Sequence, residues 1–239
     1  MKQTLISLIA VPLLVFAMPA MAADTTETWD VGATDVDFYT GFDGLGLAGN
    51  DQAVYSSIML GYGIIQDFSA YLTVGMGADG HIANGYTELN FGIFGTPVDT
   101  RHFDLDLFMD FGISGAGLKT FVITPGLEMN YDYAQDMIKW GLYLRVNPPI
   151  QRPLEVPITL GAYWVVKDGH QLLLEFDTDF YPSDRKTVIG GLALGYNVCL
   201  TKGCGIEMIN QVYFDIPQSD KRFNVGLMTG FIATLPSVK

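Results

Sequence analysis

The 239-residue chain is poor in cysteine, histidine and basic residues. Its two cysteines can form one disulfide at most, which excludes a disulfide-rich framework. Only 13 Lys and Arg stand against 26 Asp and Glu, which gives a formal net charge of −13. This balance argues against nucleic acid as a partner, because phosphate binding requires a basic face.

Beyond its first residues, the chain also lacks a long hydrophobic run. Later apolar stretches are broken by Gly, Asp or Thr, which excludes a helical membrane protein. The leader combines Lys2, an apolar core from residue 5 to 17, and the small-x-small site Ala20-Met21-Ala22. About 13 apolar residues are too few for an anchor, since a membrane-spanning helix needs about 20. We therefore expect residues 1–22 to be a signal peptide that is cut after Ala22.

The two cysteines, Cys199 and Cys204, lie close together in "YNVCLTKGCGI". Export places them in an oxidising compartment, and their separation across a turn is within disulfide reach. A redox or metal pair is the alternative, but no third or fourth ligand lies nearby in the sequence. We expect a disulfide, and we expect neither a metal nor a cofactor.

The rest of the chain is dominated by alternation of apolar with polar or glycine positions, interrupted by turn signals. This pattern predicts strands, and it leaves residues 23–35 as an N-terminal periplasmic segment and 236–239 as a C-terminal tail. The expected strands are 36–47, 53–65, 69–78, 86–95, 103–113, 121–132, 139–147, 156–166, 171–181, 187–198, 205–216 and 222–235.

The length of these segments separates a membrane barrel from a soluble sandwich, which also alternates. Strands of soluble proteins cluster near about 5–6 residues, whereas strands that cross a bilayer need about 9–11. Evenly spaced short hairpins favour an up-and-down barrel over a Greek key. The sequence thus predicts an all-β, closed, antiparallel up-and-down transmembrane β-barrel over residues 36–235, with about twelve strands and ten as the alternative.

The segment "FDLDLFMDFGI" at residues 103–113 shows the expected sidedness most clearly. Large apolar residues occupy its odd positions, and Asp104, Asp106 and Asp110 occupy even ones. A slip by one residue would exchange the two faces, and each acid at mid-bilayer costs a few kcal/mol. We expect the apolar side chains to face lipid and the acids to face a wet interior. Closure is required because an open sheet edge in lipid leaves backbone groups unpaired.

The same parity places many acids and few bases on the interior. Rings of carboxylates attract cations, so an open interior would favour cations. The alternative is a polar plug in which acids pair with bases, tyrosines and water. Twelve strands lie between the filled eight-stranded barrels and the sixteen-stranded aqueous channels. The expected lumen-lining residues are Glu88, Asp104, Asp106, Asp110, Glu128, Glu175, Asp177, Asp179 and Glu207, with Lys139 and Arg145 as bases.

Aromatic residues on the outward parity gather near the ends of the expected strands. Trp and Tyr prefer the boundary between hydrocarbon and headgroups, so two girdles from one register test the assignment. The girdle expected near the periplasmic end comprises Tyr62, Phe103, Tyr131, Trp140, Trp164, Tyr196 and Phe231.

A signal peptide followed by alternating strands resembles the outer-membrane β-barrel class of Gram-negative bacteria, over roughly residues 36–235. The resemblance is one of pattern, and it implies location in the outer membrane. The implied partners are outer-membrane lipid, the barrel-assembly machinery and small polar or cationic solutes. One departure is that Phe231, the last outward aromatic residue, is not the end of the chain, whereas this class usually finishes on an aromatic.

Catalytic chemistry finds little support. A nucleophile needs a base and an orienting group beside it, but His81, His102 and His170 fall in expected loops with no serine in a recognisable motif. We therefore expect no enzyme but a small diffusion channel with an acidic, cation-favouring lumen. The alternatives are a non-conducting structural or scaffold barrel and, third, an outer-membrane enzyme.

Overall fold

The computed structural model describes residues 29–45, 53–79, 86–115, 120–135, 138–151, 153–167, 169–183, 185–202, 204–216 and 224–236. The expected signal peptide, most of the expected tail and His81 lie outside these ranges. No helix in the described ranges is long and apolar enough to cross a membrane. The strands are β1 (Thr34–Leu45), β2 (Ala53–Ile65), β3 (Phe68–Asp79), β4 (Tyr86–Asp99), β5 (Phe103–Gly115), β6 (Thr120–Gln135), β7 (Ile138–Val146), β8 (Val156–Lys167), β9 (His170–Tyr181), β10 (Lys186–Cys199), β11 (Ile206–Asp215) and β12 (Asn224–Leu235).

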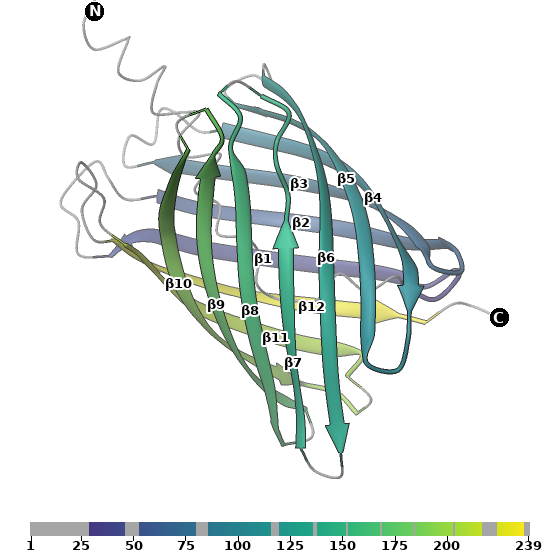
Figure 1. Cartoon of the computed structure of the whole chain (residues 1–239). Helices are drawn as coiled ribbons and strands as arrows, with labels where there is room; N and C mark the ends of the chain where they lie inside the picture. Colours follow the sequence, from purple (N-terminus) through teal and green to yellow (C-terminus); the bar gives the residue numbers. More distant parts are fainter. Residues whose placement is uncertain are drawn as a thin grey trace, which may run out of the picture.

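These strands form one closed barrel in which each strand pairs with the next in the chain (Figure 1). The circle closes where β1 pairs antiparallel with β12, from Thr34 opposite Leu235 onwards. The all-β, up-and-down fold and the twelve strands expected from the sequence are confirmed, and the ten-strand alternative is wrong. The short connections between consecutive strands explain this order, because a hairpin can only place its second strand beside its first.

Strand β4 extends beyond residue 95, where the sequence predicts its end, and takes in most of "GTPVDT". The Gly, Pro and Asp of this segment predict a turn, and that prediction is wrong. The pairing of β4 with β5 shifts register between Gly95 and Val98 and then resumes with Val98 opposite Leu105. A bulge of this kind absorbs extra residues without ending the strand. Turn residues in the sequence therefore marked a bulge here.

Pro125 leaves no irregularity in the pairing of β5 with β6, where Met109 lies opposite Pro125. A proline inside an expected strand predicts a bulge or kink because it lacks an N–H, and this pairing shows none. On its other side β6 pairs with β7 only from Leu127 onwards, so Pro125 lies beyond the end of that ladder. Proline is tolerated at such strand positions because no ladder partner is lost.

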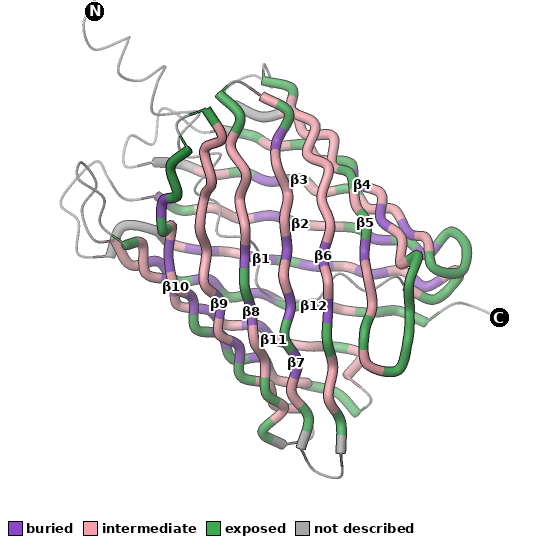
Figure 2. Tube along the Cα trace, in the orientation of Figure 1, coloured by how far each residue is buried: buried purple, intermediate pink, exposed green. Residues whose placement is uncertain are grey.

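Burial alternates along the strands (Figure 2). In β12, Gly226, Met228 and Gly230 are buried, whereas Leu227 and Phe231 between and beyond them are 42% and 43% exposed. The exposed side chains on alternate positions are predominantly large and apolar. The barrel therefore has an apolar outer wall, and its polar side chains point inward.

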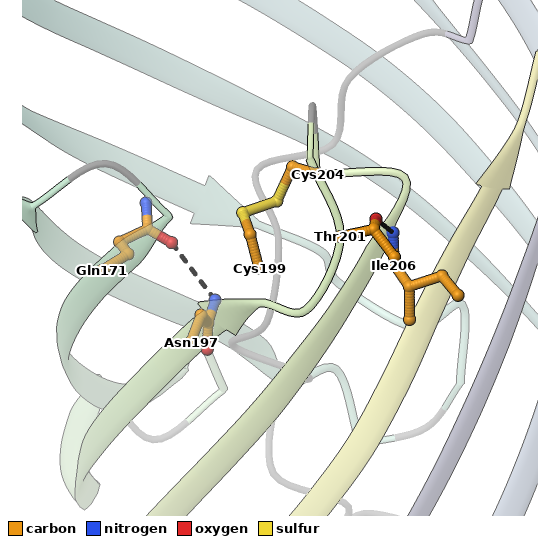
Figure 3. The surroundings of a disulfide bond; sticks show 6 residues. All are labelled: Gln171, Asn197, Cys199, Thr201, Cys204 and Ile206. Carbon is orange, nitrogen blue, oxygen red and sulfur yellow. Dashed lines mark hydrogen bonds between the residues drawn. A yellow bond between two sulfur atoms is a disulfide. The ribbon is translucent and has the colours of Figure 1, made fainter.

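The two ends of the barrel carry different connections between strands. The terminus end is where β1 begins and β12 ends, and it carries the turns between β2 and β3, β4 and β5, β6 and β7, β8 and β9, and β10 and β11; we call the opposite end the loop end. At the terminus end, a disulfide joins Cys199 to Cys204 across the turn from β10 to β11, with a Cα–Cα distance of 4.9 Å (Figure 3). Within this turn the Ile206 N–H donates to the Thr201 hydroxyl at 2.9 Å. The covalent and hydrogen-bonded closure holds β11 at its start.

Candidate functional site in the barrel interior

The barrel register places the expected interior acids on the inward positions of β4, β5, β6, β9 and β11. They fall into two groups by exposure. Asp106, Glu128 and Glu175 are at most 1% exposed, whereas the others in the set are partly exposed. The partly exposed acids are Glu88, Asp104, Asp110, Asp177, Asp179 and Glu207.

The two expected bases lie on the inward positions of β7 and differ in their surroundings. Lys139 is exposed near the terminus end. Arg145 is buried and forms an ion pair with Glu128 on β6, the one salt bridge found among the described residues. Arg145 also interacts electrostatically with Asp110 on β5 and Asp177 on β9. A single guanidinium thus balances carboxylates from three other strands.

The interior contains a repeated arrangement that we call the Tyr–Gly–acid row. In the first row, Tyr71 on β3 lies opposite Gly92 on β4, which lies opposite Asp110 on β5. The Tyr71 hydroxyl donates a hydrogen bond to Asp110, so the ring must cross the glycine between them. A Cβ atom at Gly92 would overlap this ring.

The second row runs across the neighbouring strands. Tyr163 on β8 lies opposite Gly141 on β7, which lies opposite Asp132 on β6, and the tyrosine hydroxyl donates to the Asp132 carboxylate. A side chain on Gly141 would overlap the Tyr163 ring, so this position requires glycine.

The third row begins on β7 and runs across β8 to β9. Tyr143 lies opposite Gly161 on β8, which lies opposite Glu175 on β9, and the Tyr143 hydroxyl donates to Glu175. Gln211 on β11 donates to the other oxygen of Glu175 at 3.1 Å. Buried carboxylates are costly unless they are hydrogen-bonded, and these rows supply the donors from two strands away.

The glycine of the third row gives a direct test. Gly161→Ala is expected to lower the free energy of unfolding by about 2–4 kcal/mol, because the new methyl group displaces the Tyr143 ring and takes the hydroxyl from Glu175. The control is Gly112→Ala, also on an inward position, where a Cβ atom would meet the Asn90 Oδ1 atom at an ordinary 3.5 Å. Urea unfolding in lipid vesicles measures both, and equal losses in the two variants would contradict the row.

A second polar cluster lies nearer the terminus end. The Asn130 Nδ2 atom donates to Asp104 at 2.7 Å and to Asp106 at 3.1 Å, and Thr96 also donates to Asp106. Asp104 further experiences electrostatic repulsion from Asp99 and from other carboxylates nearby. The partly exposed Asp104 thus lies among several carboxylates near the terminus end.

Sequence reasoning missed two features of the interior. Asp35, which lay outside the expected first strand, is 3% exposed on the inner wall and accepts a hydrogen bond from Thr234 at 2.7 Å. Its parity with Asp37 and Tyr39 was a usable signal. The second feature is an apolar cluster that joins Tyr39 to residues on β11 and β12, namely Ile209, Met228 and Ile232. Part of the interior is thus filled with hydrocarbon.

The described histidines contact other groups at the terminus end. The Nδ1 atom of His102 lies 2.9 Å from the backbone carbonyl oxygen of Asp132. The Nδ1 atom of His170 lies 2.6 Å from the hydroxyl of Tyr196, and the two rings stack. Within the described ranges, no group of three or more His, Cys, Asp or Glu side chains is arranged to hold a metal ion.

Comparison with known proteins finds likeness in structure alone. No protein-family model matches the chain, and no curated protein sequence matches it. Solved structures with a similar fold include the KdgM porin in complex with disordered oligogalacturonate (TM-score 0.64, 9% identity, 84% of this chain and 99% of that one). The NanC porin is similar (0.63, 10%, 84% and 100%), as is an outer membrane channel from Pseudomonas putida F1 (0.57, 11%, 91% and 99%). The fold is that of outer-membrane β-barrels, as the sequence pattern predicted.

Proposed function

We propose that this chain is a Gram-negative outer-membrane channel that passes small solutes by diffusion and favours cations. The observation that carries the proposal is the division of the strands into an apolar outer wall and an acid-rich inner wall. An interior of this charge attracts cations and repels anions.

The outer wall supports a location in lipid. Leu107, Leu142 and Leu160, at the middle of their strands, are each about half exposed on this wall. Contiguous exposed apolar surface of this extent is rare on soluble proteins, and a closed barrel satisfies its backbone hydrogen bonds without water. We propose that the outward aromatic residues at the terminus end lie at the membrane boundary, namely Tyr62, Phe103, Tyr131, Trp140, Trp164, Tyr196 and Phe231.

The inner wall supports selectivity for cations. From β4 to β9, inward acids outnumber inward bases, and Arg145 is already paired with Glu128. Asp104, Asp110 and Asp177 are partly exposed, and the single Arg145 guanidinium, already paired with Glu128, cannot neutralise all of their charge.

The charge of this interior also bears on which solutes could pass. The KdgM porin has been solved with oligogalacturonate, a polymer of acidic sugars. The likeness to that porin is one of fold, and the acid-rich interior described here would repel a polyanion. We propose small polar or cationic solutes instead.

Conductance across planar bilayers tests the proposal. The purified protein is expected to conduct and to show a reversal potential that favours cations. The variant D104N/D106N/D110N is expected to lower the cation-to-anion permeability ratio at least about twofold, because it removes three inward carboxylates of β5. The control is D67N, which removes a carboxylate from an exposed turn. Preference for anions, or unchanged selectivity in the triple variant, would refute the cation-favouring interior.

The second candidate function is a non-conducting structural or scaffold barrel. It is favoured by one specific observation: Glu128 and Glu175 are at most 1% exposed and are held in hydrogen bonds, as expected for a filled interior. A folded protein that gives no conductance would support this candidate over the channel.

A further inference from the structure

The described chain begins with a short segment that turns back into the barrel. Residues 29–33, which we call the mouth segment, precede β1 at the terminus end. The Ala33 N–H donates to the Asp30 carbonyl at 2.8 Å, and Gly32 between them has a φ of 80°. This is a tight turn whose third residue requires the left-handed conformation that glycine adopts freely. The turn reverses the chain and sends Trp29 toward the inner wall.

Backbone hydrogen bonds attach the mouth segment to the end of β2. The Gly32 N–H donates to the Gly63 carbonyl at 2.8 Å, and the Gly63 N–H donates to the Ala33 carbonyl at 3.1 Å. The Trp29 N–H donates to the hydroxyl of Ser69 on β3 at 3.1 Å, and Ser69 is fully buried. Three main-chain contacts to two strands therefore fix the segment inside the mouth.

The Trp29 side chain fits a seat on the inner wall. Its indole covers Gly61 on β2, where a Cβ atom would overlap the ring. The Trp29 and Phe94 rings pack edge to face, with ring centroids 5.0 Å apart and an interplanar angle of 78°. Edge-to-face packing of this kind is a favoured aromatic geometry. A glycine at 61 leaves the space that the indole occupies.

Further aromatic residues lie on the inner wall beside Trp29. The Phe94 ring lies 6.1 Å from that of Tyr71, and Phe94 also lies opposite Phe108 on β5. All of these residues occupy inward positions of β3, β4 and β5. Rigid rings on these inward positions reduce the open cross-section near the terminus end.

We infer that Trp29 sets the size limit of the channel at the terminus end. This inference rests on the proposed channel function and adds a specificity-determining residue: the mouth admits single small solutes and rejects oligomers. It therefore separates this chain from a barrel that accommodates an oligosaccharide.

The test compares two variants that remove the Trp29 indole from its position over Gly61. W29A removes the indole, and G61A places a methyl group where the indole lies and so displaces it. The controls are W140A, which removes a tryptophan from the outer wall, and G112A, which adds a methyl group in ordinary space. Single-channel conductance and the swelling of liposomes in mono-, di- and trisaccharides give the size limit. Heat-dependent mobility on gels identifies folded protein for each variant.

W29A and G61A are expected to raise conductance at least about twofold and to admit larger sugars, with both controls at the wild-type values. A silent wild type with a conducting W29A also supports the inference. A conducting wild type with unchanged W29A and G61A refutes the role of Trp29 and leaves the channel standing. If neither wild type nor W29A conducts, the channel proposal fails and the size limit fails with it.

Fluorescence reports on the seat without requiring conduction. In the variant W140F/W164F, Trp29 is the remaining tryptophan of the three in the chain. Brominated lipid is expected to leave its emission unchanged, and adding G61A is expected to increase quenching by aqueous acrylamide. Quenching by the lipid, or no response to G61A, would overturn the placement on which the inference depends.

Discussion

Replacing Arg145 with methionine is expected to lower the free energy of unfolding by about 3–5 kcal/mol. The change leaves Glu128, which is 0% exposed, without its ionic partner. It also removes a guanidinium that interacts with Asp110 and Asp177. Unfolding by urea in lipid vesicles, followed by tryptophan fluorescence, measures the loss.

The double variant E128Q/R145M separates the ion pair from simple loss of packing. It is expected to recover part of the lost stability, because a neutral Glu128 replacement no longer carries an uncompensated buried charge. Lys139→Met is the matched control, since Lys139 lies on the same strand and the same parity but is exposed. A loss in K139M as large as that in R145M, or no recovery in the double variant, would argue against the buried pair.

An outward charge is expected to have the other large effect. Leu107→Arg is expected to destabilise the barrel in lipid by about 2–4 kcal/mol, because Leu107 is 49% exposed on the outer wall near the middle of β5. Folding into vesicles of defined thickness, measured by the gel shift of heated and unheated samples, checks this result. The loss is expected to shrink in detergent micelles, where water reaches the side chain more easily.

The control introduces the same side chain on the other face. Thr73 lies at an inward position of β3, opposite Asn90, so Thr73→Arg places its charge toward the interior acids. We expect a change within about 1 kcal/mol, since lumen substitutions tune selectivity more than stability. If L107R and T73R cost the same, the outer wall does not face hydrocarbon.

The fold was largely accessible from the sequence because strand structure repeats every second residue. Alternation in "FDLDLFMDFGI" alone separates Asp104 from Leu105, and the same reading along the chain led to twelve strands. The strand ends that were predicted wrongly contain residue types that occur both in turns and in bulges. Gly95 in "GTPVDT" suits a turn or a bulge equally, and only pairing with β5 decides between them.

The interior contacts were harder to predict from the sequence. Alternation shows which side chains share a face of the sheet, but not which of them meet across neighbouring strands. Tyr71 and Asp110 are 39 residues apart and meet only because two registers align across Gly92. The seat of Trp29 depends likewise on a turn at Gly32 and on the end of β2. Contacts of this kind depend on the registers of several strand pairs, and the alternation within a single strand does not reveal those registers.

The Tyr–Gly–acid rows also constrain the register between strands, which the contrast between an apolar outer wall and a polar inner wall does not fix by itself. Sliding one strand by two residues along its neighbour keeps every side chain on the same face of the sheet. Contact with lipid or water therefore does not disfavour the shifted register. Such a slide would bring Asn90 or Phe94 opposite Tyr71 in place of Gly92, and the phenol ring would have nowhere to lie. The rows therefore favour the native register over one shifted by two residues, so the glycines contribute to the choice of register as well as leaving space for the rings.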